Sequence, residues 1–371
     1  MEETSVIINV QNGKSYPVYI SVESIHDLKQ KLDMLCGGKK RLVVISEKVH
    51  KLYKNELNFN KNELFILKDG ENKKNLKTFE KIIKRAISLK LSRKDMIIAL
   101  GGGVTGDIAG FVSASYMRGI DYIQVPTTLL ACVDSSVGGK TAIDMPCGKN
   151  YVGAFYQPKA VYINLNFLKT LDNKQYKSGF GEILKYAFIE KSCLNDEYYN
   201  LLEILKNNPN NYKKRDMKFL LKIIVICLKL KASVVNKDEK EENLRKILNF
   251  GHTFGHALEE ATQYKRYTHG YGVMLGIMFA FNMARKNGIC ARQYYDEAFS
   301  LIGIYEYKTD NFLFVNKKKV LKLMKNDKKN VDNMLVFILP SKTGEVVEYK
   351  AADFLNSEFD LKYIPPIIDK N

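Results

Sequence analysis

The chain has 371 residues, of which 46% are hydrophobic and 27% charged. This composition excludes a disordered or collagen-like chain and, at about 100–200 residues per domain, predicts two domains. No apolar stretch reaches the ~20 residues of a membrane-spanning helix, and residues 1–6 (MEETSV) lack the apolar core of a signal peptide. The six cysteines form no C-x-x-C pair and are expected to be reduced thiols of a cytoplasmic protein.

The net charge of +17 arises from 58 basic and 41 acidic residues. Solvated helix faces, an anionic small substrate or a nucleic acid would each account for it. The basic residues are spread along the chain, and neither an aromatic RNA-binding motif nor a zinc finger accompanies them. The sequence therefore favours the first two explanations over nucleic-acid binding.

Up to residue 164, short apolar runs alternate with helical periodicity. Runs at 41–46, 63–68, 95–100 and 122–126 predict strands, 75–91 and 108–116 predict helices, and 101–106 predicts a turn. This alternation indicates a parallel α/β sheet. From residue 165 a 3.6-residue period dominates, at 179–190, 217–234, 255–262, 271–286 and 292–301. We therefore expect an α/β domain over 1–164 and a mainly α-helical domain over 165–371.

Gly101, Gly103 and Gly106 fit the pattern G-x-G-x-x-G between a predicted strand and a predicted helix. Glycines in this context let the backbone approach a pyrophosphate at a helix N-terminus. No clear acidic partner for a ribose follows about 20 residues later. A tight strand–helix turn without a ligand is the alternative.

Residues 133–141 (VDSSVGGKT) imitate a phosphate-binding P-loop, but Asp134 stands where its first glycine belongs. An ATP-binding loop is therefore not expected. Lys140 after Gly139 and Lys149 after Gly148 lie on predicted glycine loops, which suit a phosphate or carboxylate. Ordinary surface lysines on two exposed turns are the alternative.

Three of the five histidines, His252, His256 and His269, fall within 18 residues. His252 and His256 are four apart and share one face of a predicted helix, where imidazoles can converge on a metal ion. Thr253 excludes the H-E-x-x-H protease motif, so a carboxylate must come from elsewhere, and Glu182 in an apolar stretch is a candidate. Purely structural histidines are the alternative.

Together, the stretches GGGVTGDIAGFVSASYMRG, IQVPTTLLACVDSSVGGKTAID, GKNYVGAFYQP, GFGEILKYA, RKILNFGHTFGHALE and NDKKN resemble the 3-dehydroquinate synthase family of sugar-phosphate cyclases, from about residue 69 to 330. The resemblance implies a Rossmann-like NAD-binding α/β domain, a helical C-terminal domain and an active site in the interdomain cleft. It also implies conversion of 3-deoxy-D-arabino-heptulosonate 7-phosphate to 3-dehydroquinate and phosphate, a step of the shikimate pathway in aromatic amino acid biosynthesis.

The family's site positions carry over residue by residue. For one divalent metal, zinc or cobalt, the implied ligands are Glu182, His252 and His269. The implied catalytic residues are Arg118, Asp134, Lys140, Lys185, Asn249 and His256. Those implied to bind the substrate's phosphate and carboxylate are Arg118, Lys140, Asn150, Lys231, Arg245, His256 and Lys328. Those implied to bind NAD are Glu71, Lys74, Gly102, Gly103, Asp107, Thr127, Thr128, Lys149, Thr170 and Leu171.

The resemblance further implies that NAD oxidises the substrate only transiently, so that phosphate leaves, the hydride returns and an aldol step closes the ring. Three other functions stay open: a cyclase for another sugar phosphate, a polyol dehydrogenase that would release NADH, and a nucleic-acid-binding protein. We expect the protein to bind a small sugar phosphate and to bind neither nucleic acid nor a membrane. We also expect it to form a homodimer.

Two positions depart from the family. After His269 the usual H-G-E-A-V reads H-G-Y-G-V, so that Tyr271 replaces an acid. If that acid supports His269, metal should be lost more easily here, and Tyr271→Glu should tighten binding about 10-fold; simple packing of Tyr271 is the alternative. At the adenosine end, Ser46-Glu47-Lys48-Val49 replaces the usual Asp-x-Asn-Val, which predicts altered ribose contacts.

Overall fold

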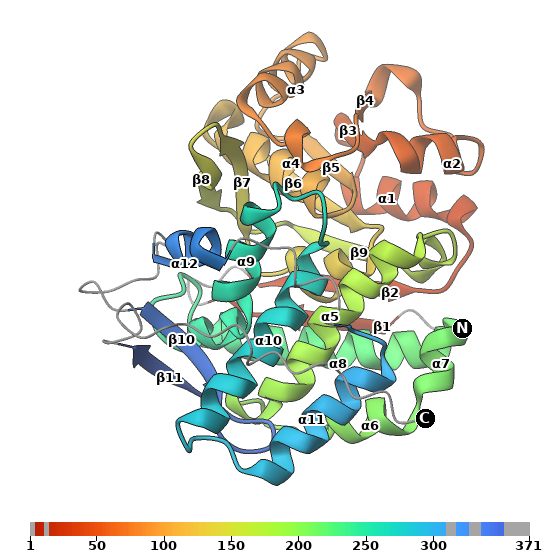
Figure 1. Cartoon of the computed structure of the whole chain (residues 1–371). Coiled ribbons are helices and arrows are strands. Elements are labelled where there is room, and N and C mark those ends of the chain that lie inside the picture. The colour runs from red at the N-terminus through yellow and green to blue at the C-terminus, as the bar shows by residue number, and fades with distance from the viewer. Residues whose placement is uncertain (1–3, 11–14, 309–316, 326–334, 352–371) are drawn as a thin grey trace. The chain divides into compact units, whose positions relative to one another are not determined.

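The computed structural model describes residues 4–10, 15–308, 317–325 and 335–351 (Figure 1). The chain forms two compact units, Met1–Tyr176 and Lys177–Asn371. Residues 165–176, which the sequence placed at the start of the second domain, group with the first unit.

A seven-stranded sheet forms the centre of the first unit, in the order β1-β2-β9-β6-β5-β3-β4. Only the β1–β2 pair is antiparallel. The strands are β1 (Thr4–Ile8), β2 (Tyr16–Ser21), β3 (Arg41–Ser46), β4 (Leu64–Leu67), β5 (Met96–Gly101), β6 (Asp121–Pro126) and β9 (Ala160–Asn164). The predicted parallel α/β sheet is confirmed.

Helices cover the sheet on both faces, which explains the continuous apolar runs of its central strands. In β3, Val43 and Ile45 pack with α1 (Leu28–Cys36) and α2 (Glu47–Leu57). The alternate residues Leu42 and Val44 pack with α3 (Leu76–Ser88) and α4 (Gly103–Ser115). Both faces of the strand are therefore core, as the period of two requires.

The glycine segment differs from its prediction, because α4 already begins at Gly103 with Gly102 as its N-cap. None of its glycines has a positive φ. A Cβ at Gly101 would lie 2.4 Å from Oγ1 of Thr105, and one at Gly106 would lie 2.8 Å from Oε1 of Gln124. Close packing of α4 on the sheet, rather than a left-handed turn, therefore requires glycine here.

The two predicted glycine loops are strands. β7 (Lys140–Met145) and β8 (Gly148–Phe155) form an antiparallel pair. Positive φ angles occur before β7, at Gly138 (100°) and Gly139 (67°), and within β8, at Gly148 (158°) and Asn150 (55°). Lys140 pairs with Phe155 in this ladder, whereas Lys149 lies in β8 beside the irregularity between Ile143 and Met145.

The second unit is mainly helical, as predicted. Its helices are α5 (Asn173–Ile189, which starts just before the unit), α6 (Leu201–Asn207), α7 (Pro209–Lys214), α8 (Met217–Lys237), α9 (His252–Ala261), α10 (His269–Lys286), α11 (Arg292–Ile304) and α12 (Lys317–Lys325). An antiparallel pair that the sequence did not predict, β10 (Leu335–Pro340) and β11 (Val346–Ala351), follows them.

All six cysteines are free thiols, as expected. Among the described residues, no helix has both the length and the apolar composition needed to cross a membrane.

Candidate functional site

Glycines bring the three helices of the predicted metal site into backbone contact. A Cβ at Gly270 would lie 1.8 Å from the carbonyl oxygen of Ser178 in α5. A Cβ at Gly276 would lie 1.8 Å from the carbonyl oxygen of Gly251, just before α9. The glycines around the histidine motifs therefore allow α10 to touch both neighbours, so that side chains from all three helices meet.

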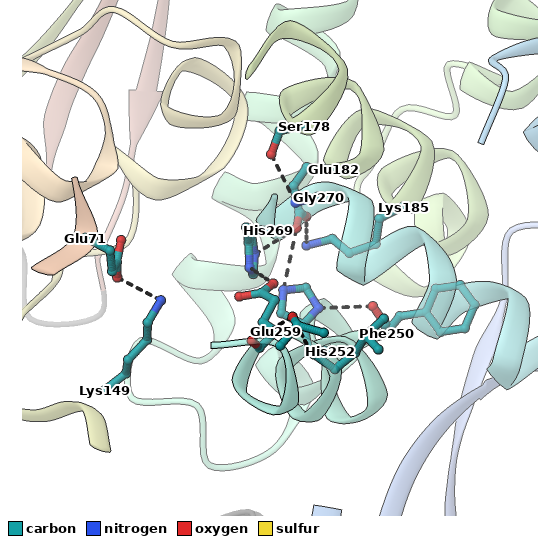
Figure 2. A network of polar contacts seen from close by, with 12 residues as sticks. Glu71, Lys149, Ser178, Glu182, Lys185, Phe250, His252, Glu259, His269 and Gly270 are labelled. Atoms are coloured by element: carbon teal, nitrogen blue, oxygen red, sulfur yellow. Dashed lines mark hydrogen bonds and ion pairs between the residues drawn. The ribbon is translucent and has the colours of Figure 1, made fainter. Parts of the chain in front are cut away.

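Glu182, His252 and His269 converge in the second unit (Figure 2). Oε1 of Glu182 lies 3.6 Å from Nε2 of His252 and 3.3 Å from Nε2 of His269. His256 is close as well, since ligand atoms of the three histidines lie within 4.8 Å of one another. The fully buried Glu182 supplies the negative charge that a divalent cation needs.

The Nδ1 atoms of His252 and His269 each have a polar partner, which leaves their Nε2 atoms facing the carboxylate of Glu182. Nδ1 of His252 lies 3.1 Å from the carbonyl oxygen of Phe250, and Nδ1 of His269 lies 3.1 Å from Oε1 of Glu259 (Figure 2). Acceptors at Nδ1 favour the tautomers whose Nε2 carries a free electron pair. Two imidazoles and a carboxylate so arranged fit a catalytic zinc or cobalt site.

The site attracts positive charge. Burial opposes a charge on His269, but Glu259 and Glu182 outweigh burial and raise the pKa of His269 to about 10. Nζ of Lys185 lies 2.5 Å from Oε2 of Glu182, and both side chains are buried. Lys185 thus compensates the buried carboxylate from one turn further along α5.

Two predicted site residues of the second unit, Arg245 and Asn249, follow a turn after α8, and Lys231 lies within α8 itself. The carboxylate of Asp238 accepts hydrogen bonds from the backbone N–H groups of residues 242, 243 and 245, and so fixes this turn. Arg245 and Lys231 are both buried, and the Asn249 amide donates to Oε1 of Glu241. Lys328 lies outside the described residues.

In the first unit, Lys74 gathers several predicted NAD residues. Its Nζ lies 2.9 Å from Asp107 and 2.6 Å from the amide oxygen of Asn150. Glu71 lies 3.5 Å from Nζ of Lys74. It also lies 3.0 Å from Nζ of Lys149 (Figure 2). Lys74 is 3% exposed, so this network ties the start of α3 to α4 and β8.

The remaining predicted residues of the first unit surround the ends of β5 and β6 or stand apart. Gly102 faces Thr128, Gly103 faces Ser135, and the N–H of Thr127 donates to Gly101. Asp134 lies in a π-helical turn, Ala131–Ser135, of a kind frequent at functional sites.

The other predicted residues of the first unit lie elsewhere. Oγ1 of Thr170, the residue before Leu171, lies 2.6 Å from the hydroxyl oxygen of Tyr53. Arg118 is exposed in a turn of positive φ.

The segment from Ser46 to Val49, which departs from the family pattern, makes structural contacts. Ser46 caps α2 by accepting from the N–H of Val49, and the N–H of Lys48 donates to Asp69. Nζ of Lys48 lies 2.8 Å from Asp172.

Tyr271 contacts Lys308, Tyr307 and Lys177. Its hydroxyl donates to the carbonyl of Lys308 at 2.8 Å and accepts from the N–H of Lys308 at 3.0 Å. Its ring packs 5.4 Å from that of Tyr307, with Nζ of Lys177 5.7 Å from the centre of the Tyr271 ring. The structure thus agrees with the packing alternative, and Glu259 holds His269 instead.

We therefore expect Tyr271→Phe to lower stability by about 1 kcal/mol, or Tm by about 2–4 °C, without changing the metal dissociation constant more than about 2-fold. Thermal unfolding and competition with a metal-buffering chelator measure the two. Tyr271→Glu should not tighten metal binding; a 10-fold gain would show that position 271 does support His269.

Sequence reasoning missed Glu259 and Glu241. Glu259 lies seven residues after His252, hence on the same face of α9, and that spacing was the available signal. Glu241 stands in an acidic run without periodicity, and only its φ of 65° and its bond to Asn249 mark it in the structure.

Comparison with known proteins gives a consistent result. Residues 64–178 match the N-terminal and 179–330 the C-terminal family model of 3-dehydroquinate synthase. The 3-dehydroquinate synthase of Thermoanaerobacter sp. (strain X514) is 40% identical over 90% of this chain and 93% of its own length. That of Prochlorococcus marinus (strain AS9601) is 40% identical over 91% of this chain and 93% of its own.

Among solved structures, 2-deoxy-scyllo-inosose synthase complexed with carbaglucose-6-phosphate, NAD+ and Co2+ matches with a TM-score of 0.79 and 26% identity. The match covers 93% of this chain and 94% of the other. The family resemblance and the predicted fold class are thus confirmed, and the chain belongs to the 3-dehydroquinate synthase family.

Proposed function

We propose that this chain is a phosphorus–oxygen lyase that converts 3-deoxy-D-arabino-heptulosonate 7-phosphate to 3-dehydroquinate and phosphate, using NAD and one divalent metal. The observation that carries the proposal is the convergence of Nε2 of His252 and of His269 on Oε1 of Glu182, at 3.6 and 3.3 Å. It occurs in a chain 40% identical to named 3-dehydroquinate synthases over most of its length.

Glu182, His252 and His269 would hold the metal, which supplies Lewis-acid polarisation of substrate oxygens, while NAD supplies reversible hydride transfer. His256 is exposed, whereas Glu182 is buried among ligand groups. We therefore assign Glu182 to the metal and leave His256 for the substrate phosphate. Three protein ligands leave coordination positions for substrate oxygens.

The chain's own cations orient and stabilise the anionic ends of the substrate. Lys231 is buried in α8 and Arg245 is buried after the turn that Asp238 fixes, so both side chains lose little freedom when they bind an anion. Lys140, Asn150, Arg118 and Lys328 complete the proposed phosphate and carboxylate contacts. Positive charge at the phosphate stabilises the negative charge that develops as it departs.

For NAD, Gly102 and Gly103 at the start of α4 offer backbone N–H groups and the positive end of a helix dipole to the pyrophosphate. The Lys74 network holds Asp107, Glu71 and Lys149 in fixed positions around this loop. A homodimer and a cytoplasmic location complete the proposal.

Phosphate release from the heptulosonate phosphate, with trace NAD and added zinc or cobalt, tests the function. Turnover should exceed the amount of NAD, and NADH should not accumulate, because the hydride returns to the substrate. Stoichiometric NADH would indicate a dehydrogenase. The likeness to 2-deoxy-scyllo-inosose synthase makes a hexose 6-phosphate the control substrate; faster turnover of it would indicate that second candidate function.

Lys140→Ala should lower kcat/KM for this reaction by at least about 10²-fold, about 2.7 kcal/mol, because it removes a charge proposed to contact the substrate. Tm should be unchanged, since Lys140 is exposed at the start of β7. Lys159→Ala, which removes another exposed lysine of the first unit, is the matched control. A lower Tm with near-normal kcat/KM would make Lys140 structural.

A further inference from the structure

Glu259 stands between the two helices that carry the histidines. It belongs to α9, seven residues after His252 and three after His256, and is 5% exposed. Its Oε1 lies 3.1 Å from Nδ1 of His269 at the first residue of α10 (Figure 2). A buried carboxylate is costly unless it has a partner, and this one faces a ligand histidine.

The backbone of α10 is shaped to admit this carboxylate. A Cβ at Gly272 would lie 3.1 Å from Oε1 and 3.3 Å from Cγ of Glu259. A Cβ at Gly255 would lie 2.9 Å from the carbonyl carbon of Gly272, so α9 and α10 are in backbone contact at this level. Because residue 272 has no side chain, the carboxylate of Glu259 fits beside it. The backbone contact between α9 and α10 leaves this carboxylate little freedom to turn away from His269.

We propose that Glu259 is the positioning residue that prepares His269 to bind the metal. By accepting the Nδ1 proton it fixes the tautomer and the ring plane, so that Nε2 presents its electron pair next to Glu182, and its charge increases the basicity of the imidazole. The proposal deepens the proposed function and rests on the metal site described there.

The two ligand histidines are held by different means. His252 is oriented by the backbone carbonyl of Phe250, which no side-chain substitution removes. His269 depends on a side chain, and Tyr271, two residues further along α10, is occupied with Lys308. The support of His269 is therefore the part of the site that a single substitution can remove without touching a metal ligand.

Metal affinity tests the proposal directly. We expect Glu259→Gln to weaken the apparent dissociation constants for zinc and cobalt about 10-fold, since it keeps the shape and an accepting oxygen but removes the charge. Glu259→Ala should approach 100-fold, the upper end of the effect of such partners. Competition with a metal-buffering chelator measures both constants. Glu260→Gln, the neighbouring acid on the exposed side of α9, is the matched control and should stay within about 2-fold.

A second readout separates positioning from mere stability. At saturating cobalt, the visible absorption bands of the bound ion should shift in Glu259→Gln and stay unchanged in Glu260→Gln, while the metal-free variants keep the Tm of the parent. If Glu259→Ala does not fold, the metal affinity and the cobalt spectrum of Glu259→Gln still test the role of Glu259.

Two outcomes distinguish the failure of this proposal from that of the function. Unchanged affinity and spectrum in Glu259→Gln, in a protein whose His252→Ala variant no longer binds metal, would overturn only the role of Glu259. A parent protein that binds no divalent metal would overturn the proposed metal site itself.

Discussion

We expect His252→Ala to lose its metal and to lower the rate of phosphate release by at least about 10³-fold, about 4 kcal/mol. Only three protein ligands are proposed, so none replaces the missing imidazole. The loss should exceed the 10–100-fold weakening typical when an outer partner is removed. Elemental analysis after dialysis and the phosphate assay with added zinc or cobalt measure the two effects.

Glu182→Gln should lose metal equally and, unlike His252→Ala, should also lose stability. Nζ of Lys185 lies 2.5 Å from the carboxylate, and both groups are buried, so removing the charge leaves a buried ammonium without its counter-ion. His256→Ala is the control that tells the two ligand sets apart: it should keep its metal and lose activity. Metal loss in His256→Ala with metal retained in Glu182→Gln would assign the site to the three histidines.

The sequence predicted best those strands and helices whose residues are buried in a regular pattern. β3 is buried along its whole length, and a continuous β-branched run is typical of a strand covered on both faces. β8 was missed because its residues are mostly exposed and include three that favour turns, Gly148, Asn150 and Gly153. Its strand character comes from pairing with β7, which a local pattern does not contain.

Helix boundaries failed where tertiary contacts decide them. The glycines before Ile108 predict a turn by propensity, yet Gly103 begins α4 because that helix must pack closely on the sheet. Conversely, α2 was not predicted although Val49, Tyr53 and Leu57 are buried at intervals of four. Its many polar residues hid a narrow apolar stripe.

The site shows the same division. The spacing of His252 and His256 places them on one helix face from sequence alone. The residues also offered Glu182 and His269 as candidates, but only the family resemblance joined them with His252 as one set of ligands. Glu259 and Glu260 are adjacent acids, and helical spacing relates the first to His252 and the second to His256, so spacing does not select between them. The approach of α10 at Gly272 does so, because it leaves one carboxylate against His269.

Lys74→Met should destabilise the first unit by about 2–4 kcal/mol, because it removes the cation from a group of carboxylates. Lys74 is 3% exposed, and its Nζ lies 2.9 Å from Asp107 and 3.5 Å from both Asp144 and Glu71. Breaking a buried ion pair costs about 3–5 kcal/mol, and the partial exposure of these carboxylates reduces that figure. Urea unfolding at pH 7.5 measures the loss, with Lys84→Met on the exposed Glu80 pair as the control, which should unfold at the same urea concentration as the parent.

The destabilisation by Lys74→Met should shrink as the pH falls. Burial opposes ionisation of Glu71, but Lys74 and Lys149 outweigh burial and lower the pKa of this carboxyl. Burial dominates at Asp107 and raises its pKa despite Lys74. A lowered carboxyl pKa stabilises the fold above the ordinary value of about 4 and ceases to do so as pH falls through the folded value. In the variant, protonation also relieves repulsion between carboxylates, so both effects reduce the difference from the parent. Destabilisation that stays equal from pH 7.5 down to about pH 3, below the ordinary carboxyl pKa of about 4, would show that Lys74 acts through packing of its stem rather than through its charge.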